Sequence, residues 1–386
     1  MTRLRVGTGS SETPEATEAG SQAAATAIGQ LQGEQAALII VYASVRYDLA
    51  SLVAAIRGVT GDTPLVGATS TGHFQDGDFT IAGEGVVVLA MTAGPYRFGL
   101  ASVEGLRADA FGAGRTLARN ALAAVGPERA PHGALILLAD GLAGDQQTLL
   151  NGIHRVTGAA IPVVGGAAGD DHKLVETFVF HDDRVLTDAA AAVWIASEQP
   201  LHVVAGHGWE PVGLPMLVTK QDGTAVHELG GRPAIDVFLE DLRDHDQMAE
   251  PGTVRWHTHR AFGLIEPDGT QLIRAAYIDE DDVIRTFSPL PPYAAVQIVS
   301  CEQDDLLDVS DDIVKLALDG ADAAVILVFS CVASMDILAE RACEEAVRLQ
   351  KAAGGVPTFG FYTYGEFART TSVAGYHNAT VTALAL

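Results

Sequence analysis

Three short runs of apolar residues recur along the chain with similar surroundings, at 36–44, 133–141 and 323–331. Each run is rich in Ile, Val and Leu and lacks the alternation of apolar and polar positions that marks a half-exposed strand. All three are far shorter than the roughly 20 residues needed to cross a membrane. The pattern therefore predicts three strands that are buried on both faces of a sheet.

An amphipathic helix is predicted after each run, at 49–56, 146–153 and 337–347. Asp48 and Asp145 stand directly before the first two helices, where a carboxylate accepts hydrogen bonds from free backbone amides. The segment 334–336 is expected to cap the third helix in the same way.

A Pro-x-x-Gly pattern follows each helix and opens a second strand that ends in a loop of small residues. Strand, helix and strand thus occur in triplicate, and we call the units copy one (36–74), copy two (133–171) and copy three (323–367). Two strands joined through a helix in this way lie parallel in one sheet. The predicted fold class is α/β, with repeated strand–helix–strand units and mainly parallel central sheets.

Shorter strands with tight turns occupy the region between copies two and three, and they predict layers of antiparallel hairpins. A short helix with Pro233 in its first turn follows Gly230 and Gly231. We expect two domains, residues 1–220, which include an Ala-rich N-terminal helix segment, and residues 221–386.

The loops after the second strands are the candidate ligand contacts, because open α/β sheets bind ligands beyond the carboxyl ends of their strands. Copies one and three share the pattern G-x-x-[ST]-x-G-[HE]-F. Its polar and aromatic positions are Ser70, Thr71 and His73 in copy one and Tyr362, Thr363, Tyr364 and Glu366 in copy three. We expect these groups to face a common pocket. The alternative is that the two glycines only shape turns.

Copy two ends instead in a glycine-acid loop, in which Gly166 and Gly169 precede the carboxylates of Asp170 and Asp171. Carboxylates suit the ammonium or hydroxyl group of a ligand and oppose an anion. The G-x-x-x-x-G-K-[ST] pattern of a phosphate-binding loop is absent from the sequence. We expect this loop to join the same pocket, and a purely structural turn is the alternative.

The order and spacing of several segments resemble the FIST proteins, bacterial sensory proteins built from a FIST N and a FIST C domain. YASVRYDLASLVAAI, PLVGATSTG and VVGGAAGDD resemble FIST N, and HGWEPVGLPMLVTK and ELGGRPAIDVFLE resemble the joint between the domains. FSCVAS, GFYTYGEF and GYHNATV resemble the end of FIST C. The resemblance implies a sensory protein that binds a small ligand and signals to a partner such as a histidine kinase. The chain departs from the family at His73, where an acidic or amide residue is common.

Two classes of ligand follow from this resemblance and stay open. Some family members of this length resemble nitric-oxide sensors that hold haem, so haem b is a candidate cofactor. Haem iron takes an imidazole ligand, and His207 and His73 are the candidates. The chain has no CxxCH motif, so the haem would be held non-covalently. The other class is an amino-acid-like metabolite whose ammonium group binds Asp170, Asp171 or Glu366.

An acyltransferase-like enzyme is the alternative function. Cys331, His377 and Asn378 would supply a thiolate, a base and an orienting amide. Cysteine is also a common small core residue, and the apolar neighbours of Cys331 favour burial. We expect no catalysis and count Cys331 and His377 among the ligand contacts.

The formal net charge of −25, from 24 basic and 49 acidic residues, opposes binding to nucleic acid or to an anionic membrane surface. The N-terminus lacks an apolar signal segment, and the three cysteines form no CxxC pair. Together these features predict a cytoplasmic, non-catalytic sensory protein in signal transduction. Whether it forms a homo-oligomer is left open.

Overall fold

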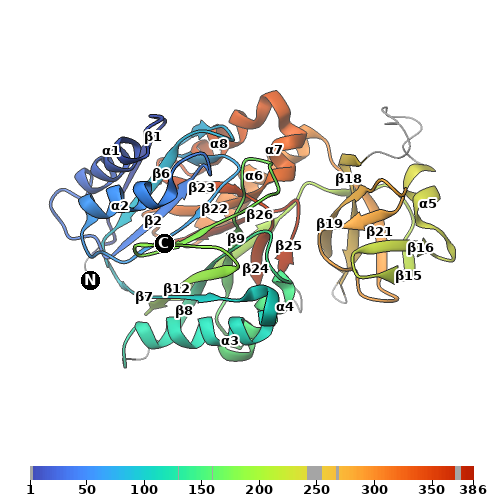
Figure 1. The fold of residues 1–386 in the computed structure, drawn as a ribbon, viewed down its shortest axis with the longest axis horizontal. Coiled ribbons are helices and arrows are strands. Elements are labelled where there is room, and N and C mark those ends of the chain that lie inside the picture. The colour runs from blue at the N-terminus through green and yellow to red at the C-terminus, as the bar shows by residue number, and fades with distance from the viewer. Residues whose placement is uncertain (1–2, 129, 159, 241–253, 267–268, 370–374) are drawn as a thin grey trace.

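The structure is a computed structural model that describes residues 3–386 apart from 129, 159, 241–253, 267–268 and 370–374. An α/β body, formed by residues 6–206 and 303–385, contains three six-stranded sheets. A β-barrel formed by residues 210–300 lies beside it (Figure 1). The predicted domain boundary at 220 falls inside strand β15 (Met216–Asp222), so the body and the barrel do not divide there.

The three sheets of the body share one arrangement of strands, in which two outer strands, the two strands of one copy and a hairpin follow one another. The sheet of copy one is β1 (Val6–Ser11), β6 (Val86–Met91), β2 (Leu38–Ala43), β3 (Leu65–Thr69), β10 (Val179–His181) and β11 (Arg184–Leu186). The sheet of copy two is β7 (Tyr96–Glu104), β12 (Ala189–Ser197), β8 (His132–Ala139), β9 (Val163–Ala167), β24 (Glu366–Arg369) and β25 (Tyr376–His377). The sheet of copy three is β13 (Val203–Gly206), β26 (Val381–Ala385), β22 (Ile326–Cys331), β23 (Thr358–Thr363), β4 (His73–Gln75) and β5 (Asp78–Thr80).

The α/β class and the triplicate strand–helix–strand unit are confirmed. The first strands β2, β8 and β22 are buried and lie parallel to β3, β9 and β23. The sheets are mixed rather than mainly parallel, because the other pairings described in each sheet are antiparallel. The outer strands and the hairpins account for this difference.

Each copy sends a hairpin into the sheet of another copy. β4 and β5 leave copy one and pair with β23 of copy three, whereas β24 and β25 leave copy three and pair with β9 of copy two. β10 and β11 leave copy two and pair with β3 of copy one, which completes a cyclic exchange. The exchange interlocks the three copies and brings the ends of their second strands together.

Helices cover the outer faces of the three sheets (Figure 1). They are α1 (Ala16–Gly29) and α2 (Leu49–Thr60), α3 (Leu106–Ala124) and α4 (Gln146–Thr157), and α6 (Gln303–Leu318), α7 (Val332–Leu338) and α8 (Ala342–Ala352). The inner faces of the sheets meet in one apolar core, which includes Ile40, Tyr42, Ile136, Leu138, Leu327 and Phe329. Side chains alternate between this core and the helix layers, which explains why both faces of each first strand are apolar.

The caps of the first two helices are confirmed, because the carboxylates of Asp48 and Asp145 accept hydrogen bonds from the amides of Ser51 and Thr148. The cap predicted at 334–336 is wrong. α7 begins directly after β22, so this segment lies within the helix. The chain then turns at Ala339, where φ is +49°, and passes through the short helix η2 (Ala339–Arg341) into α8.

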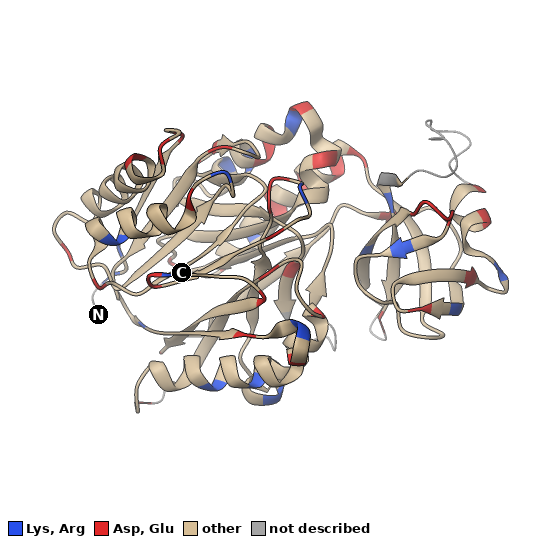
Figure 2. Cartoon of the chain, viewed as in Figure 1, with Lys and Arg blue, Asp and Glu red and all other residues tan. Residues whose placement is uncertain are grey.

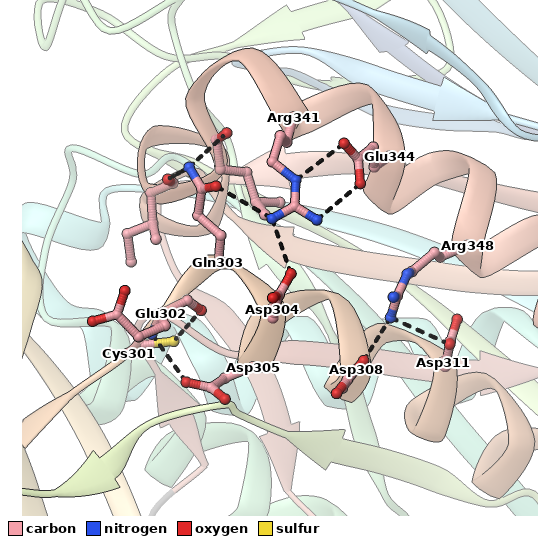
Figure 3. A network of polar contacts seen from close by, with 12 residues as sticks. Cys301, Glu302, Gln303, Asp304, Asp305, Asp308, Asp311, Arg341, Glu344 and Arg348 are labelled. Atoms are coloured by element: carbon pink, nitrogen blue, oxygen red, sulfur yellow. Dashed lines mark hydrogen bonds and ion pairs between the residues drawn. The ribbon is translucent and has the colours of Figure 1, made fainter.

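Two arginines join α8 and the segment before it to the acidic helix α6 (Figure 3). Arg341 pairs with Asp304 at 2.9 Å and with Glu344 at 3.0 Å. Arg348 pairs with Asp308 at 2.7 Å. Partly exposed pairs of this kind contribute about 1 kcal/mol or less each, so the apolar contacts beneath them carry most of the helix packing.

The barrel is closed among the described residues, because β18 (Arg255–Ile265) pairs with both β19 (Gln271–Ile278) and β21 (Ala295–Ser300). The other elements of the barrel are β14 (Glu210–Pro211), β15, β16 (Ala225–Leu229), β17 (Arg232–Pro233), β20 (Ile284–Thr286) and α5 (Ala234–Glu240). Trp209 Nε1 donates a hydrogen bond of 2.9 Å to the carbonyl of Ala379 and so fastens the barrel to the body.

Candidate functional site

The glycine of each Pro-x-x-Gly pattern permits close packing between strands. A Cβ atom at Gly67, Gly165 or Gly360 would overlap the carbonyl oxygen of the residue paired with it on the parallel strand. A phenylalanine of an exchanged hairpin lies opposite each glycine, and the pairs are Gly67 with Phe180, Gly165 with Phe367 and Gly360 with Phe74. The first glycine and the phenylalanine of the shared motif therefore serve the packing of strands against one another.

The loops that follow the three second strands contact one another. Backbone hydrogen bonds join each pair of copies, among them Gly169 N to Thr69 O at 3.0 Å, Thr71 N to Tyr362 O at 3.2 Å and Tyr364 N to Ala167 O at 3.0 Å. Two glycines permit this approach, because a Cβ atom at Gly169 would overlap Thr71 and a Cβ atom at Gly166 would overlap Thr363. The predicted loops are thus brought together, and we call them the loop ring (69–72, 167–170 and 362–365).

The motif of copies one and three places a hydroxyl beside an ionisable group in each copy. Ser70 Oγ lies 3.0 Å from His73 Nδ1, and Thr363 Oγ1 donates a hydrogen bond of 2.5 Å to Glu366 Oε1. His73 and Glu366 are fully buried. Burial lowers the pKa of His73 to about 3 and raises the pKa of Glu366 to about 8. Both side chains are therefore mainly uncharged at neutral pH.

Cys331 lies in this buried region and interacts with the side chain of Glu366. Burial, followed by the charge of Glu366, raises the pKa of the thiol well above its ordinary value. His377 Nε2 is 3.0 Å from the carbonyl of Ala368, so this nitrogen is occupied by the fold. This geometry gives no support to a Cys331 thiolate paired with a His377 base.

Tyr362 and Glu366 also contact groups of the protein. Tyr362 donates a hydrogen bond of 2.6 Å to Glu345, a buried carboxylate of α8 that also accepts from Ser310 and Ser330. The second carboxylate oxygen of Glu366 accepts from the amide of Thr380 at 3.2 Å. Tyr362 therefore faces the helix layer, and both oxygens of Glu366 have partners within the fold.

Asp170 organises the glycine-acid loop of copy two. Its carboxylate accepts hydrogen bonds from the amides of Leu174, Val175 and Glu176 and from the hydroxyl of Tyr364. Burial and the Asp170 carboxylate both raise the pKa of the Tyr364 phenol. Asp170 thus ties the loop to copy three and has no oxygen left for a ligand ammonium group.

Asp171 ties the same loop to copy one, because its carboxylate accepts from Ser44 Oγ at 2.8 Å and from the amide of Gly83 at 2.7 Å. The backbone beyond it is strained. Three residues other than glycine adopt left-handed conformations, with φ of +57° at Asp171, +62° at His172 and +52° at Leu174. Such strain persists only where the surroundings enforce it, and it clusters at ligand-binding segments. We call 170–176 the strained loop.

An open cleft of about 390 Å³ lies beside the strained loop, and we call it the strand-end cleft. It begins where β2 ends and α2 starts, at the carboxyl end of the first strand of copy one, and open α/β sheets bind ligands beyond such strand ends. Its lining residues are Val45, Tyr47, Leu49, Ala50, Asp170, Lys173, Val175, Glu176, Phe178 and Val185. Most of the wall is apolar, and Lys173 and Glu176 bring one charge of each sign on exposed side chains.

The sequence did not indicate Lys173 or Glu176 as site residues. Both are common surface residue types in a loop, and only the path of the strained loop brings them to the cleft. A second cleft, of about 780 Å³, lies at the opposite ends of the copy-one strands near Glu34 and Asp62. These two carboxylates pair with Arg5 and Arg57. The second cleft contains none of the predicted site residues.

The two histidines predicted as haem ligands occupy separate places. His207 Nε2 lies 3.2 Å from the carbonyl of Gln271, and His207 Nδ1 accepts from the amide of Trp209 at 3.3 Å. Both nitrogens thus have protein partners. His73 Nε2 has no hydrogen-bond partner among the described residues, but it is fully buried, and neither cleft described above includes it. As they stand, the two residues do not fit the role of an axial haem ligand.

Models of two domain families match most of the chain. The FIST N domain model matches residues 37–232 and the FIST C domain model matches residues 234–369. The chain belongs to the FIST family. The joint between the two models lies near Pro233, thirteen residues beyond the boundary predicted at 220, and it falls within the barrel.

Mycobacterial relatives match this FIST protein along nearly its whole length. An uncharacterized protein of Mycobacterium tuberculosis is 25% identical over 390 residues, which cover 97% of each chain. An uncharacterized protein of Mycobacterium bovis is 26% identical over 382 residues, which cover 94% of each chain. Their names assign no ligand or activity.

Solved structures of two enzymes can be superposed only loosely. A cyanuric acid hydrolase from A. caulinodans aligns with a TM-score of 0.39 at 12% identity, covering 100% of this chain and 99% of the enzyme. A chorismatase aligns with a TM-score of 0.36 at 12% identity, with the same coverage. Values this low do not support an inference of shared chemistry.

Proposed function

We propose that this FIST protein is a non-catalytic sensory protein that binds a small amino-acid-like metabolite in the strand-end cleft. The cleft itself carries the proposal, because it combines the expected place at the strand ends with a strained loop and two opposite charges. The FIST domains support the sensory class. No helix among the described residues is long and apolar enough to span a membrane.

The chemistry of the cleft suits an α-amino acid. The Lys173 ammonium group would bind the ligand carboxylate, and the Glu176 carboxylate would bind the ligand ammonium group. Val45, Leu49 and Phe178 offer an apolar wall for the ligand side chain. This arrangement replaces the predicted ammonium partners Asp170 and Asp171 with Glu176, because the carboxylates of the first two already accept bonds from the protein.

The strained loop also offers a route by which the signal would leave the cleft. His172 Nε2 lies 3.4 Å from the carboxylate of Asp336 in α7 of copy three. A ligand that reorders the strained loop would shift this contact and with it the position of α7. In this proposal the signal passes to a separate signalling protein such as a histidine kinase.

Two charge-removing variants, Lys173→Met and Glu176→Gln, test the ligand class. Calorimetric titration with the twenty common amino acids should find a ligand for the wild-type protein, and each variant should bind it at least about tenfold more weakly, because a charged hydrogen bond contributes about 1.5 to 3 kcal/mol. Lys220→Met removes an exposed lysine of the barrel and should bind as the wild type does. Equal affinity in all four proteins would place the ligand elsewhere.

An absorption spectrum tests the haem alternative directly. Because both nitrogens of His207 have partners and His73 is buried, we expect purified protein incubated with haem to show no sharp Soret band. A Soret band that shifts with nitric oxide and is altered by His207→Ala or His73→Ala would establish haem and overturn the amino-acid proposal.

A further inference from the structure

Arg274 is an unusual cation in a chain of net charge −25. It lies in β19 of the barrel, at the junction with the body, and its side chain is only 3% exposed. Asp and Glu residues are distributed along the elements of both the body and the barrel, as the red segments of Figure 2 show. Buried charges in proteins are normally paired or coordinate an ion, so a negatively charged group is expected next to Arg274.

The fold satisfies one side of the guanidinium only. Arg274 Nη1 donates to the carbonyl of Tyr376 at 3.0 Å and to the carbonyl of Ile273 at 3.1 Å. Arg274 Nε is buried without a hydrogen-bond partner. Within the described part of the chain, Arg274 makes no ion pair. In an arginine the Nε and Nη2 edge can bind a carboxylate or phosphate with two parallel hydrogen bonds, and among the described residues this edge of Arg274 has no acceptor.

The surroundings of Arg274 add basic groups rather than a counter-ion. The pKa of His377, in β25, is lowered to about 4, mainly by burial and with contributions from Arg274 and His207. Glu366 lies opposite His377 across the strand pair, but its own raised pKa keeps it largely protonated at neutral pH. Burial lowers the pKa of Arg274 to about 10, and Tyr376, Glu266 and Asp145 offset part of this shift. None of these three forms an ion pair with Arg274 among the described residues, and no other described carboxylate does so where the barrel meets the body.

We propose that Arg274 binds an oxyanion, the carboxylate or phosphate group of a small metabolite, at the junction of barrel and body. The anion occupies the Nε and Nη2 edge and supplies the counter-charge that the fold does not provide. Because Arg274 belongs to the barrel and donates to the carbonyl of Tyr376 in the body, the anion binds where the two meet. This site is separate from the strand-end cleft.

Calorimetric titration of the full-length protein with inorganic phosphate, and separately with acetate, at constant ionic strength tests this site. We expect saturable binding of at least one of the two anions to the wild-type protein. Arg274→Met should bind it at least about tenfold more weakly. Arg119→Met removes an exposed arginine of α3 and should bind as the wild type does. Binding of phosphate alone or of acetate alone would support the site and identify the anion.

Arg274→Lys keeps the positive charge but removes the Nε and Nη2 pair that can donate two parallel hydrogen bonds. The affinity of this variant for the anion should therefore fall between those of the wild type and Arg274→Met. Arg274→Lys also keeps the proposal testable if Arg274→Met does not fold, which a thermal unfolding curve of each variant will show. Absence of binding of both anions to the wild-type protein would overturn the proposal. Equal affinity in the wild type and both Arg274 variants would overturn it as well.

Discussion

Ile136→Asp is expected to abolish folding. Ile136 is fully buried in β8 and lies in the core where the three sheets of the body meet. It pairs with Val193 of one neighbouring strand and Val164 of the other, so a carboxylate at this position cannot reach solvent. Burial of an unpaired charge costs several kcal/mol, which is comparable to the whole stability of a typical domain. Circular dichroism and thermal unfolding should show no cooperative transition.

Leu122→Asp is the matched control for this change. Leu122 lies in α3 with its side chain 44% exposed, so the same introduced charge remains solvated. This variant should unfold within a few degrees of the wild type. If Ile136→Asp melted at the wild-type temperature, the assignment of β8 to the common core would be wrong.

The wild-type protein is expected to lose stability as the pH rises. Glu366→Gln is expected to abolish this pH dependence. Burial raises the pKa of Glu366 from its ordinary value of 4.5 to about 8. Between these two values the unfolded chain releases the proton while the folded chain keeps it, so the free energy of unfolding falls as the pH rises. A shift of this size corresponds to on the order of 4 to 5 kcal/mol, fully lost above about pH 8.

Denaturant unfolding at pH 5 and pH 8.5 measures this effect. At pH 8.5 Glu366→Gln should be more stable than the wild type, and the difference should shrink to about 1 kcal/mol or less at pH 5. Glu84→Gln, at an exposed position, should follow the wild type at both values. Parallel pH profiles for Glu366→Gln and the wild type would mean that Glu366 is ionised in the fold and solvated.

The fold could be predicted from the sequence where neighbouring residues determine it. Asp48 and Asp145 cap helices through hydrogen bonds from backbone amides three residues further along the chain. The apolar runs form strands because a central strand of a covered sheet is buried on both faces. The exchange of hairpins could not be predicted. Phe74 and Gly360 meet across 286 positions of sequence, and neither residue type specifies which copy will supply its partner.

The candidate site was predicted only in part, for a related reason. The loops that follow the second strands do come together, as their shared motif indicated. The sequence does not reveal how many hydrogen bonds a carboxylate already accepts, so Asp170 was interpreted as a ligand contact although three loop amides occupy it. Lys173 and Glu176 border the cleft only because of the strained backbone at His172 and Leu174.

Hydrogen–deuterium exchange over the whole chain, with and without the amino acid that binds most tightly, tests the central claim most directly. Our account predicts slower exchange at 45–50 and 170–178, which border the strand-end cleft, because a bound ligand would hold the strained loop in place. Exchange should be unchanged at 34–37 and 59–64, which border the second cleft. Slowing at the second cleft alone, or no change anywhere in the chain, would contradict the account.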